Sequence, residues 1–333
     1  MNPKSLYKET NELYTPIREA GKGTCGSITF CVCTPSPASP STTDSMAQSA
    51  VLIAVKIPTR EMRRDRIADE IIALERVRNL LVADKNETVR KHLPILIDND
   101  PIKNGGSGWL AMSPICGFDL ERLRVVVTEM VQPSSEIDLP RRFPFPAIPE
   151  VLVLHVAKQL TEAIGWLHDV ANISHNDVFG GNVMLNISVS SKGPSFTLPT
   201  VVLIDFDRAI LEPDKMAKGA DRSYTYELIH MLDDSGRVLS QETNAWEDVI
   251  APKDAITWWD AFRNFLVINK SQYRQDGSAS FAKFWERFGE EIDRRLGNTT
   301  QEDQRRVQEL IDMVVEKEVR FPSDERIREV LGE

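Results

Sequence analysis

Glycine and polar residues interrupt apolar segments at five places along this chain, and their order constrains the fold. Residues 21–26 are rich in glycine, and Lys56 lies in the middle of an apolar run. Glu70 follows in a helical pattern, residues 175–182 begin His-Asn-Asp and end in Asn, and residues 205–207 read Asp-Phe-Asp. Five such segments in this order are hard to reach by chance. We therefore expect the fold to bring them together at one site.

Length and composition limit the class of protein. A chain of 333 residues, of which 41% are hydrophobic, can bury a large core and favours two lobes or domains over one small module. Charged residues make up 27%, an ordinary balance for a globular protein. The formal net charge of −10 argues against nucleic acid as a partner, because binding phosphate backbones requires a basic surface.

The sequence also bears on the cellular compartment. Residues 1–12 are polar and charged, which predicts no secretory signal. The longest apolar runs, such as residues 51–55, are too short to cross a bilayer. We expect an intracellular, cytoplasmic protein without a membrane partner, and the oligomeric state stays open.

The first part of the chain is rich in predicted strands. Residues 21–33 read as strand, tight glycine turn and strand, with apolar residues alternating as in a half-buried strand. Residues 34–50 are rich in Pro, Ser and Thr and predict a flexible surface insertion. A helix is expected from about residue 60 to 82, with Glu70 beside its apolar stripe. Further strands are expected at 51–57, 93–97 and 109–112, with a turn at 104–106 between the last two.

The second part is mainly helical by pattern. Apolar residues recur at helical spacing over residues 149–170, after a proline-rich connection at 133–149. Two short strands are expected at 183–186 and 201–204. Further helices are expected at about 254–269, 279–296, 301–318 and 323–331.

Lys56 requires a charged partner, since an unpaired ammonium in an apolar strand is costly. Glu70 is the preferred partner because it borders the apolar stripe of the following helix, and Glu75 on the same helix is the alternative. Lys56 could also reach solvent from an edge strand. The glycines of residues 21–26 let backbone amides approach a phosphate, although a plain turn between strands would use them too.

The segment 173–185 carries the strongest signal. Asp177 and Asn182, five residues apart on one loop, can orient an acceptor hydroxyl and bind a magnesium ion. Asp205 follows an apolar strand and offers a second, charged ligand of the kind that magnesium prefers. For His175, a structural hydrogen bond is expected rather than a role as general base.

Together these segments resemble the eukaryotic protein kinase-like superfamily over roughly residues 15–330. The resemblance implies an α+β, two-lobed fold. Residues 1–116 would form an antiparallel sheet with one main helix, and residues 117–333 a mainly helical lobe. It also implies an ATP- and Mg²⁺-dependent phosphotransferase, with ATP in the cleft between the lobes.

The resemblance assigns a role to each residue. Lys56 would bind the phosphates with Glu70 as its partner, Asp177 would be catalytic, and Asn182 and Asp205 would bind the metal. The residues that would contact the nucleotide are Gly21, Gly23, Gly26, Lys56, the backbone of Ser113 and Ile115 beside gatekeeper Met112, and Asp119 at the ribose. Less specifically, Glu227 resembles the glutamate that closes the activation segment, and Arg320 its partner.

Three positions depart from the family pattern. Asn176 stands where many protein kinases carry arginine, so dependence on a phosphorylated activation segment is not expected. Phe179 replaces the lysine that steadies the transferred phosphate in serine/threonine kinases. Asp207 replaces the glycine of the Asp-Phe-Gly motif, as in small-molecule kinases of the aminoglycoside and choline type.

Three functions are compatible with this pattern. A protein serine/threonine kinase is preferred, because residues 207–226 are long enough to form a platform for an extended, basic peptide. Phe179 and Asp207 favour a small-molecule or sugar kinase instead. A pseudokinase scaffold is the third reading, which the retained Lys56, Asp177 and Asp205 disfavour.

Overall fold

The structure, a computed structural model, describes residues 14–23, 26–33, 51–59, 64–84, 87–100, 108–131, 148–187, 197–234, 257–272 and 280–317. These residues form a mixed α+β structure with an antiparallel sheet and several helices. The insertion expected at 34–50, the turn at 104–106, Arg320 and the helix at 323–331 lie outside the described residues.

The main sheet has five strands, and each pair of neighbours is antiparallel. In spatial order they are β1 (Tyr14–Lys22), β2 (Gly26–Cys33), β3 (Val51–Pro58), β5 (Leu110–Met112) and β4 (Leu96–Asn99). The pairing places Lys56 of β3 opposite Ile28 of β2 and Leu110 of β5. Lys56 therefore lies on an interior strand, which excludes the alternative of an edge strand.

Helix α2 (Arg64–Asp84) packs against this sheet, and the short α3 (Glu87–Arg90) follows it. The apolar stripe expected for α2 is confirmed, because every member of it is buried: Ile67, Ile71, Leu74, Val77 and Leu81. Glu70 lies beside the stripe and is itself buried. The helix thus presents a carboxylate, rather than an apolar group, to the strand that carries Lys56.

Strand β2 is more buried than the sequence pattern predicted. Its Phe30 belongs to the core beneath α2, whereas Cys31 belongs to a second apolar cluster on the other face of the sheet. That second cluster is closed by Tyr14 and Trp109, whose rings meet edge to face at 5.6 Å. Apolar side chains cover both faces, so alternation alone underestimated the burial.

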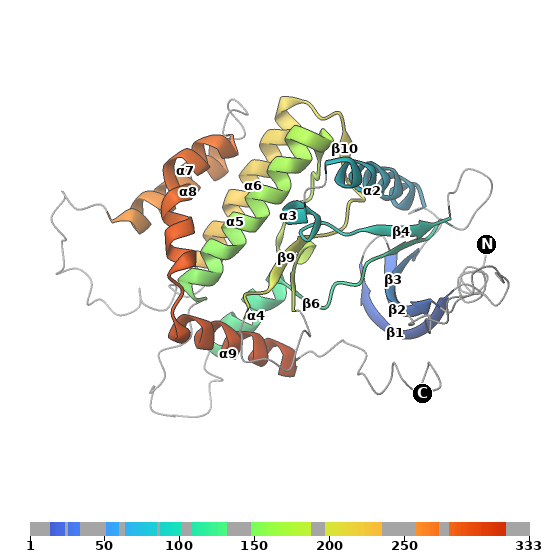
Figure 1. The fold of residues 1–333 in the computed structure, drawn as a ribbon, viewed down its shortest axis with the longest axis horizontal. Helices are drawn as coiled ribbons and strands as arrows, with labels where there is room; N and C mark the ends of the chain where they lie inside the picture. Colours follow the sequence, from blue (N-terminus) through green and yellow to red (C-terminus); the bar gives the residue numbers. More distant parts are fainter. Residues whose placement is uncertain are drawn as a thin grey trace, which may run out of the picture.

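The remaining helices follow in the second part of the chain, and Figure 1 shows α5 to α8 at the opposite end from the five-stranded sheet. They are α4 (Leu120–Val131), α5 (Glu150–Trp166), α6 (Lys215–Asp234), α7 (Trp258–Gln272), α8 (Phe281–Gly297) and α9 (Gln301–Lys317). Aromatic rings of α7 and α8 pack together and against Tyr226 of α6. Within the described residues, none of the helices has the length and apolar character needed to cross a membrane.

Short strands between these helices carry the polar segments. A three-stranded sheet has the order β6 (Gly117–Asp119), β8 (Val183–Asn186) and β9 (Thr200–Leu203). A two-stranded sheet pairs β7 (Ile173–Ser174) with β10 (Ile210–Leu211). The loop 175–182 therefore leaves β7 and enters β8 with both ends anchored.

Two side chains connect the sheet region to the helical region. The Nδ1–H of His92 donates a 2.8 Å hydrogen bond to the carbonyl of Val201, and the amide of Leu203 donates to the carbonyl of His92 at 3.0 Å. At the end of α2, Asp84 accepts a 3.0 Å hydrogen bond from the indole of Trp166. These bonds fix α2 and its following loop relative to β9 and α5.

The structure corrects several sequence predictions at the ends of elements. The strand expected at 93–97 begins only at Leu96, and helix α5 ends at Trp166, where a π-helical turn (Leu167–Ala171) continues the chain. The π turn ends at Asn172, which adopts the left-handed conformation (φ 52°). These changes in element ends do not involve the glycine-rich segment 21–26 or the loops that carry Asp177 and Asp205.

Most of the segment 207–226, which was expected to form a platform for an extended peptide, is helical. Helix α6 begins at Lys215 and runs to Asp234. Glu227 lies exposed on this helix. The large buried apolar residues of α6, such as Leu228 and Ile229, lie in its second half, while the first half is mostly polar with small or exposed apolar residues, so its helical period is weak in the sequence.

Candidate functional site

A cavity of about 650 Å³ lies between the five-stranded sheet and the strands β6 and β8. Its volume falls within the range of ligand-binding pockets, which is roughly 300–1,000 Å³. Every site residue expected from the sequence lines it: Gly21, Gly23, Gly26, Lys56, Glu70, Ser113, Ile115, Asp119, Asp177, Asn182 and Asp205. The structure therefore brings together residues from both halves of the chain.

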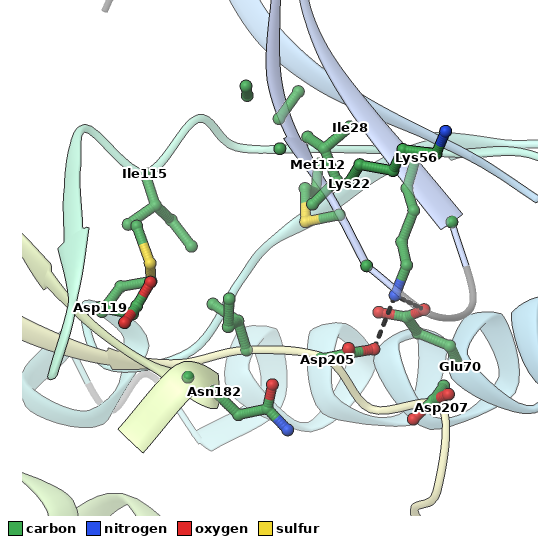
Figure 2. A pocket seen from close by; sticks show the side chains of 18 of the residues that line it. Lys22, Ile28, Lys56, Glu70, Met112, Ile115, Asp119, Asn182, Asp205 and Asp207 are labelled. Carbon is green, nitrogen blue, oxygen red and sulfur yellow. Dashed lines mark hydrogen bonds and ion pairs between the residues drawn. The ribbon is translucent and has the colours of Figure 1, made fainter. Parts of the chain in front are cut away.

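Lys56 lies at the centre of an ion network at one end of the cavity. Its ammonium is 2.6 Å from Glu70 Oε2 and 2.7 Å from Asp205 Oδ1, and Figure 2 shows it reaching down between the two carboxylates. Only 4% of Lys56 and 1% of Glu70 are exposed. The other partner considered, Glu75, accepts a hydrogen bond from Asn99 instead.

Burial and pairing act in opposite directions on these charges. Burial alone would lower the pKa of Lys56, but the attraction of Glu70 and Asp205 outweighs it and raises that pKa. Burial raises the pKa of Glu70, and the nearby charges of Asp205 and Asp207 add to the effect, while Lys56 lowers it. Lys56 therefore stays protonated, and the ionised form of Glu70 depends on it.

Gly26 shows why the turn above Lys56 carries glycine. A Cβ at this position would lie 2.9 Å from the carbonyl oxygen of Ile57 and 3.0 Å from Cγ of Lys56. A larger side chain would therefore displace the lysine stem from the cavity. At Gly21, by contrast, a Cβ would meet no atom within 4 Å, so space alone does not require glycine there.

The loop 175–182 holds a carboxylate at the opposite wall. Asn182 Nδ2 donates to the carbonyl of Asp177 at 2.9 Å and to its Oδ2 at 3.0 Å. Arg208 Nη1 lies 3.1 Å from the other carboxylate oxygen of Asp177. The carboxylate is thus oriented from both sides, and it remains partly exposed to the cavity.

Asp221 of α6 anchors this loop, and the sequence analysis missed it. Its Oδ2 accepts hydrogen bonds from His168 Nε2 (2.9 Å), Ser174 Oγ (2.8 Å) and the amide of His175 (2.7 Å), and its Oδ1 accepts one from the amide of Asn176 (2.7 Å). The side chain is fully buried. The available signal is an aspartate on the buried face of a helix, but no helix was predicted for residues 207–226 from the sequence.

Backbone strain is concentrated in the same region. Asn176 (φ 59°) and Asp205 (φ 66°) both adopt the left-handed conformation that non-glycine residues seldom take. Asn176 is held by its bond to Asp221, and Asp205 by its ion pair with Lys56. Asp205 lines the cavity, and Asn176 directly precedes Asp177, which also lines it.

His175 has the structural role expected of it. Its Nε2–H donates a 2.9 Å hydrogen bond to the carbonyl of Ile204, and its ring meets Phe206 edge to face at 4.8 Å. Burial lowers its pKa, which keeps the ring neutral. His175 thus supports the segment that carries Asp205 and does not itself line the cavity.

The far end of the cavity is formed by the chain between β5 and α4. Met112 is buried, and the amide of Ser113 donates to the carbonyl of Ile95 at 2.9 Å, so only the carbonyl of Ser113 remains for a ligand. Asp119 Oδ1 accepts a 2.7 Å hydrogen bond from the amide of Arg122 and thereby caps α4. Burial raises the pKa of Asp119.

Several lining residues were not nominated as site residues: Lys22, Arg122, Phe179, Asp207 and Arg208. Asp207 is buried below Glu70, as Figure 2 shows, whereas Phe179 is 49% exposed. Within the described residues, no cluster of three or more His, Cys, Asp or Glu side chains is arranged to hold a metal ion. A metal bound here would need ligands from its substrate in addition to Asn182 and Asp205.

Comparison with known proteins adds no family assignment. No protein-family model matches this chain, and no curated protein matches it either.

Proposed function

We propose that the protein is an ATP- and Mg²⁺-dependent phosphotransferase that transfers the γ-phosphate of ATP to an alcohol group. One observation carries this proposal: the buried Lys56–Glu70–Asp205 network and the Asp177–Asn182 pair line the same cavity. A two-lobed, protein kinase-like arrangement is part of the proposal. The antiparallel sheet with α2 and the mainly helical remainder support it.

The nucleotide would occupy the length of the cavity. Its adenine would contact the backbone of Ser113 and Ile115, and its ribose would lie at Asp119. Its phosphates would lie under Gly21, Gly23 and Gly26. Lys56, protonated and held by Glu70, would neutralise phosphate charge. A cation fixed in advance costs no reorganisation during the reaction.

The residues present also suit a magnesium ion. Magnesium is commonly bound through one or two protein oxygens together with substrate phosphates and water, so Asn182 and Asp205 suffice. When bound, the ion would supply charge neutralisation at the phosphates. The Nδ2 of Asn182 donates hydrogen bonds to Asp177. The side-chain oxygen of Asn182 therefore points away from the carboxylate of Asp177.

Asp177 would orient the acceptor. Its carboxylate accepts the hydroxyl proton as the oxygen of the acceptor bonds to the γ-phosphorus and the bond from that phosphorus to the bridging oxygen breaks. The products are ADP and a phosphate monoester. Orienting or acid–base groups of this kind typically contribute roughly 10²–10⁴ in rate.

The form of α6 favours a small hydroxylated molecule as the acceptor. Only residues 208–214 separate Asp207 from the start of α6 at Lys215, which leaves no room for a long peptide platform. Ser223 and Thr225 are buried in the helix, so phosphorylation there would disrupt it. The helical form of this segment therefore supports a small acceptor over a peptide.

A protein serine or threonine remains the second candidate. The observation in its favour is exposed apolar surface on Phe179 of the Asp177 loop, on Ile210 and Leu211 of β10, which pairs with β7, and on Met216 of α6. Such a surface could contact an apolar side chain of a peptide. It could equally contact an apolar part of a small acceptor.

The test is a transfer assay with γ-labelled ATP and Mg²⁺. The protein is incubated with aminoglycosides, choline and sugars in one series and with a basic peptide library in another. The expected result is label on a small molecule that is lost in the Asp177→Asn variant. Label on peptides alone would favour the second candidate, and nucleotide binding without any transfer would indicate a scaffold.

A further inference from the structure

The cation that steadies a transferred phosphate is absent from the loop at Asp177. Two residues beyond Asp177 stands Phe179, an aromatic side chain without charge. Its ring packs over Gly181, where a Cβ would lie 2.7 Å from Phe179 Cε2. The loop itself therefore provides no positive charge between Asp177 and Asn182.

Arg208 brings a positive charge to the same place from another segment. Its guanidinium Nη1 is 3.1 Å from Asp177 Oδ1, and the residue lines the cavity. The lining cations within the described residues are Lys22, Lys56, Arg122 and Arg208. Among these, Arg208 forms an ion pair with Asp177.

The backbone at Arg208 is fixed on both sides. The amide of Ala209 donates to the carbonyl of Phe206 at 3.0 Å, closing a turn, and Phe206 is fully buried. Immediately after the turn, Ile210 pairs with Ser174 in the two-stranded sheet. The guanidinium is thus presented from an anchored turn, although its side chain is 54% exposed.

An ion pair this exposed adds little to stability, typically about 0.2–1 kcal/mol. Stability alone therefore gives Arg208 no strong reason to lie against Asp177. A guanidinium has several donors in a planar fork, so it can keep one contact with Asp177 and offer others to phosphate oxygens.

We propose that Arg208 is a catalytic residue that binds the phosphoryl group in transit, an inference that rests on the proposed function. As the acceptor oxygen bonds to the γ-phosphorus and the bond to the bridging oxygen breaks, charge spreads over the equatorial oxygens. Arg208 donates hydrogen bonds to these oxygens while the hydroxyl proton passes to Asp177. Arg208 remains protonated throughout.

The test compares two nucleotide complexes, because it requires no knowledge of the acceptor. Calorimetry measures the affinity of the full chain for Mg–ADP alone and for Mg–ADP with tetrafluoroaluminate, which imitates the phosphoryl group in transit. Wild type should bind the second complex more tightly. Arg208→Gln should weaken tetrafluoroaluminate-dependent binding on the order of 10²-fold, the usual effect of removing one preorganised donor, and leave ADP affinity nearly unchanged.

Two further variants sharpen the result. Arg208→Lys keeps the charge but loses the fork, and should bind the mimic between wild type and Arg208→Gln. The matched control is Arg294→Gln, which removes a similarly exposed arginine paired with Glu291 on α8, far from the cavity lining. This control should bind both complexes like wild type.

The outcomes separate the two proposals. If wild type binds neither complex, the proposed function fails. If wild type binds both and Arg208→Gln matches it, Arg208 has no role at the phosphoryl group. Tighter binding of both complexes by Arg208→Gln would instead make Arg208 a latch that blocks Asp177, which also overturns the inference.

Discussion

Replacement of Lys56 by methionine tests the buried ion network at the centre of the site. Methionine preserves most of the apolar stem but removes the ammonium that lies 2.6 Å from Glu70. Removing one partner of a buried ion pair typically destabilises a protein by about 3–5 kcal/mol, because the other charge is left without compensation.

Glu70 can limit this cost by taking up a proton. With an unfolded pKa of 4.5, protonation at pH 7.5 costs about 1.36 × 3, or about 4 kcal/mol, and at pH 5.5 about 1.4 kcal/mol. In the variant, the pKa of Glu70 rises further in the folded state than in wild type, because Lys56 no longer lowers it, so stability relative to wild type is lost as pH rises. We expect Lys56→Met to lose about 3–4 kcal/mol at pH 7.5 and about 1–2 kcal/mol at pH 5.5.

Urea unfolding at both pH values, followed by tryptophan fluorescence, measures these differences. The double variant Lys56→Met/Glu70→Leu should regain most of the loss, because it leaves no buried charge at Glu70. Lys283→Met, at an exposed position of α8, is the control and should change stability by less than about 0.5 kcal/mol. A loss below about 1 kcal/mol at both pH values would refute the reasoning.

Three further predictions concern catalysis, pH and regulation. Asp177→Asn should leave ATP affinity nearly intact and reduce turnover by roughly 10²–10⁴-fold. Equal loss of ATP binding and turnover in this variant would contradict the role of Asp177 in orienting the acceptor. Asp205→Asn should abolish magnesium-dependent transfer. Burial lowers the pKa of His92 to about 4 from 6.5, which keeps it neutral as it donates to Val201. The contribution of neutral His92 to the free energy of unfolding is about 3 kcal/mol, from 2.5 × 1.36. It should be present above pH 6.5 and lost as pH falls through 4. His92→Asn should flatten this part of the pH–stability curve, measured by urea unfolding. Phosphatase treatment should not reduce activity, since residues 223–225 lie within helix α6; a loss restored by rephosphorylation would contradict this.

The sequence predicted the local elements well where burial follows periodicity. The apolar stripe of α2 placed Glu70 beside the core, and the apolar context of Lys56 required a charged partner. These inferences succeeded because an apolar helix face must be buried and a buried charge must be paired with an opposite charge. The nucleotide-contacting residues, such as Ser113 and Asp119, were instead nominated from the resemblance to the protein kinase-like superfamily.

The sequence could not predict that the segment after Asp207 forms helix α6 or which residues this helix contacts. Helix α6 begins with polar residues and buries Asp221, whose partners are donors from the segment around β7. Neither the helix start nor these long-range hydrogen bonds leaves a periodic signal. Arg208 was not nominated as a site residue, because its partner Asp177 is distant in sequence and the β7–β10 pairing brings the two segments together.

A structure with Mg²⁺ and a non-hydrolysable ATP analogue tests the central claim most directly. We expect adenine against the backbone of Ser113 and Ile115, and the triphosphate between Lys56 and Asp205. The γ-phosphate should face Asp177. An analogue bound elsewhere, or phosphates that avoid Lys56 and Asp205, would contradict the proposed phosphotransferase.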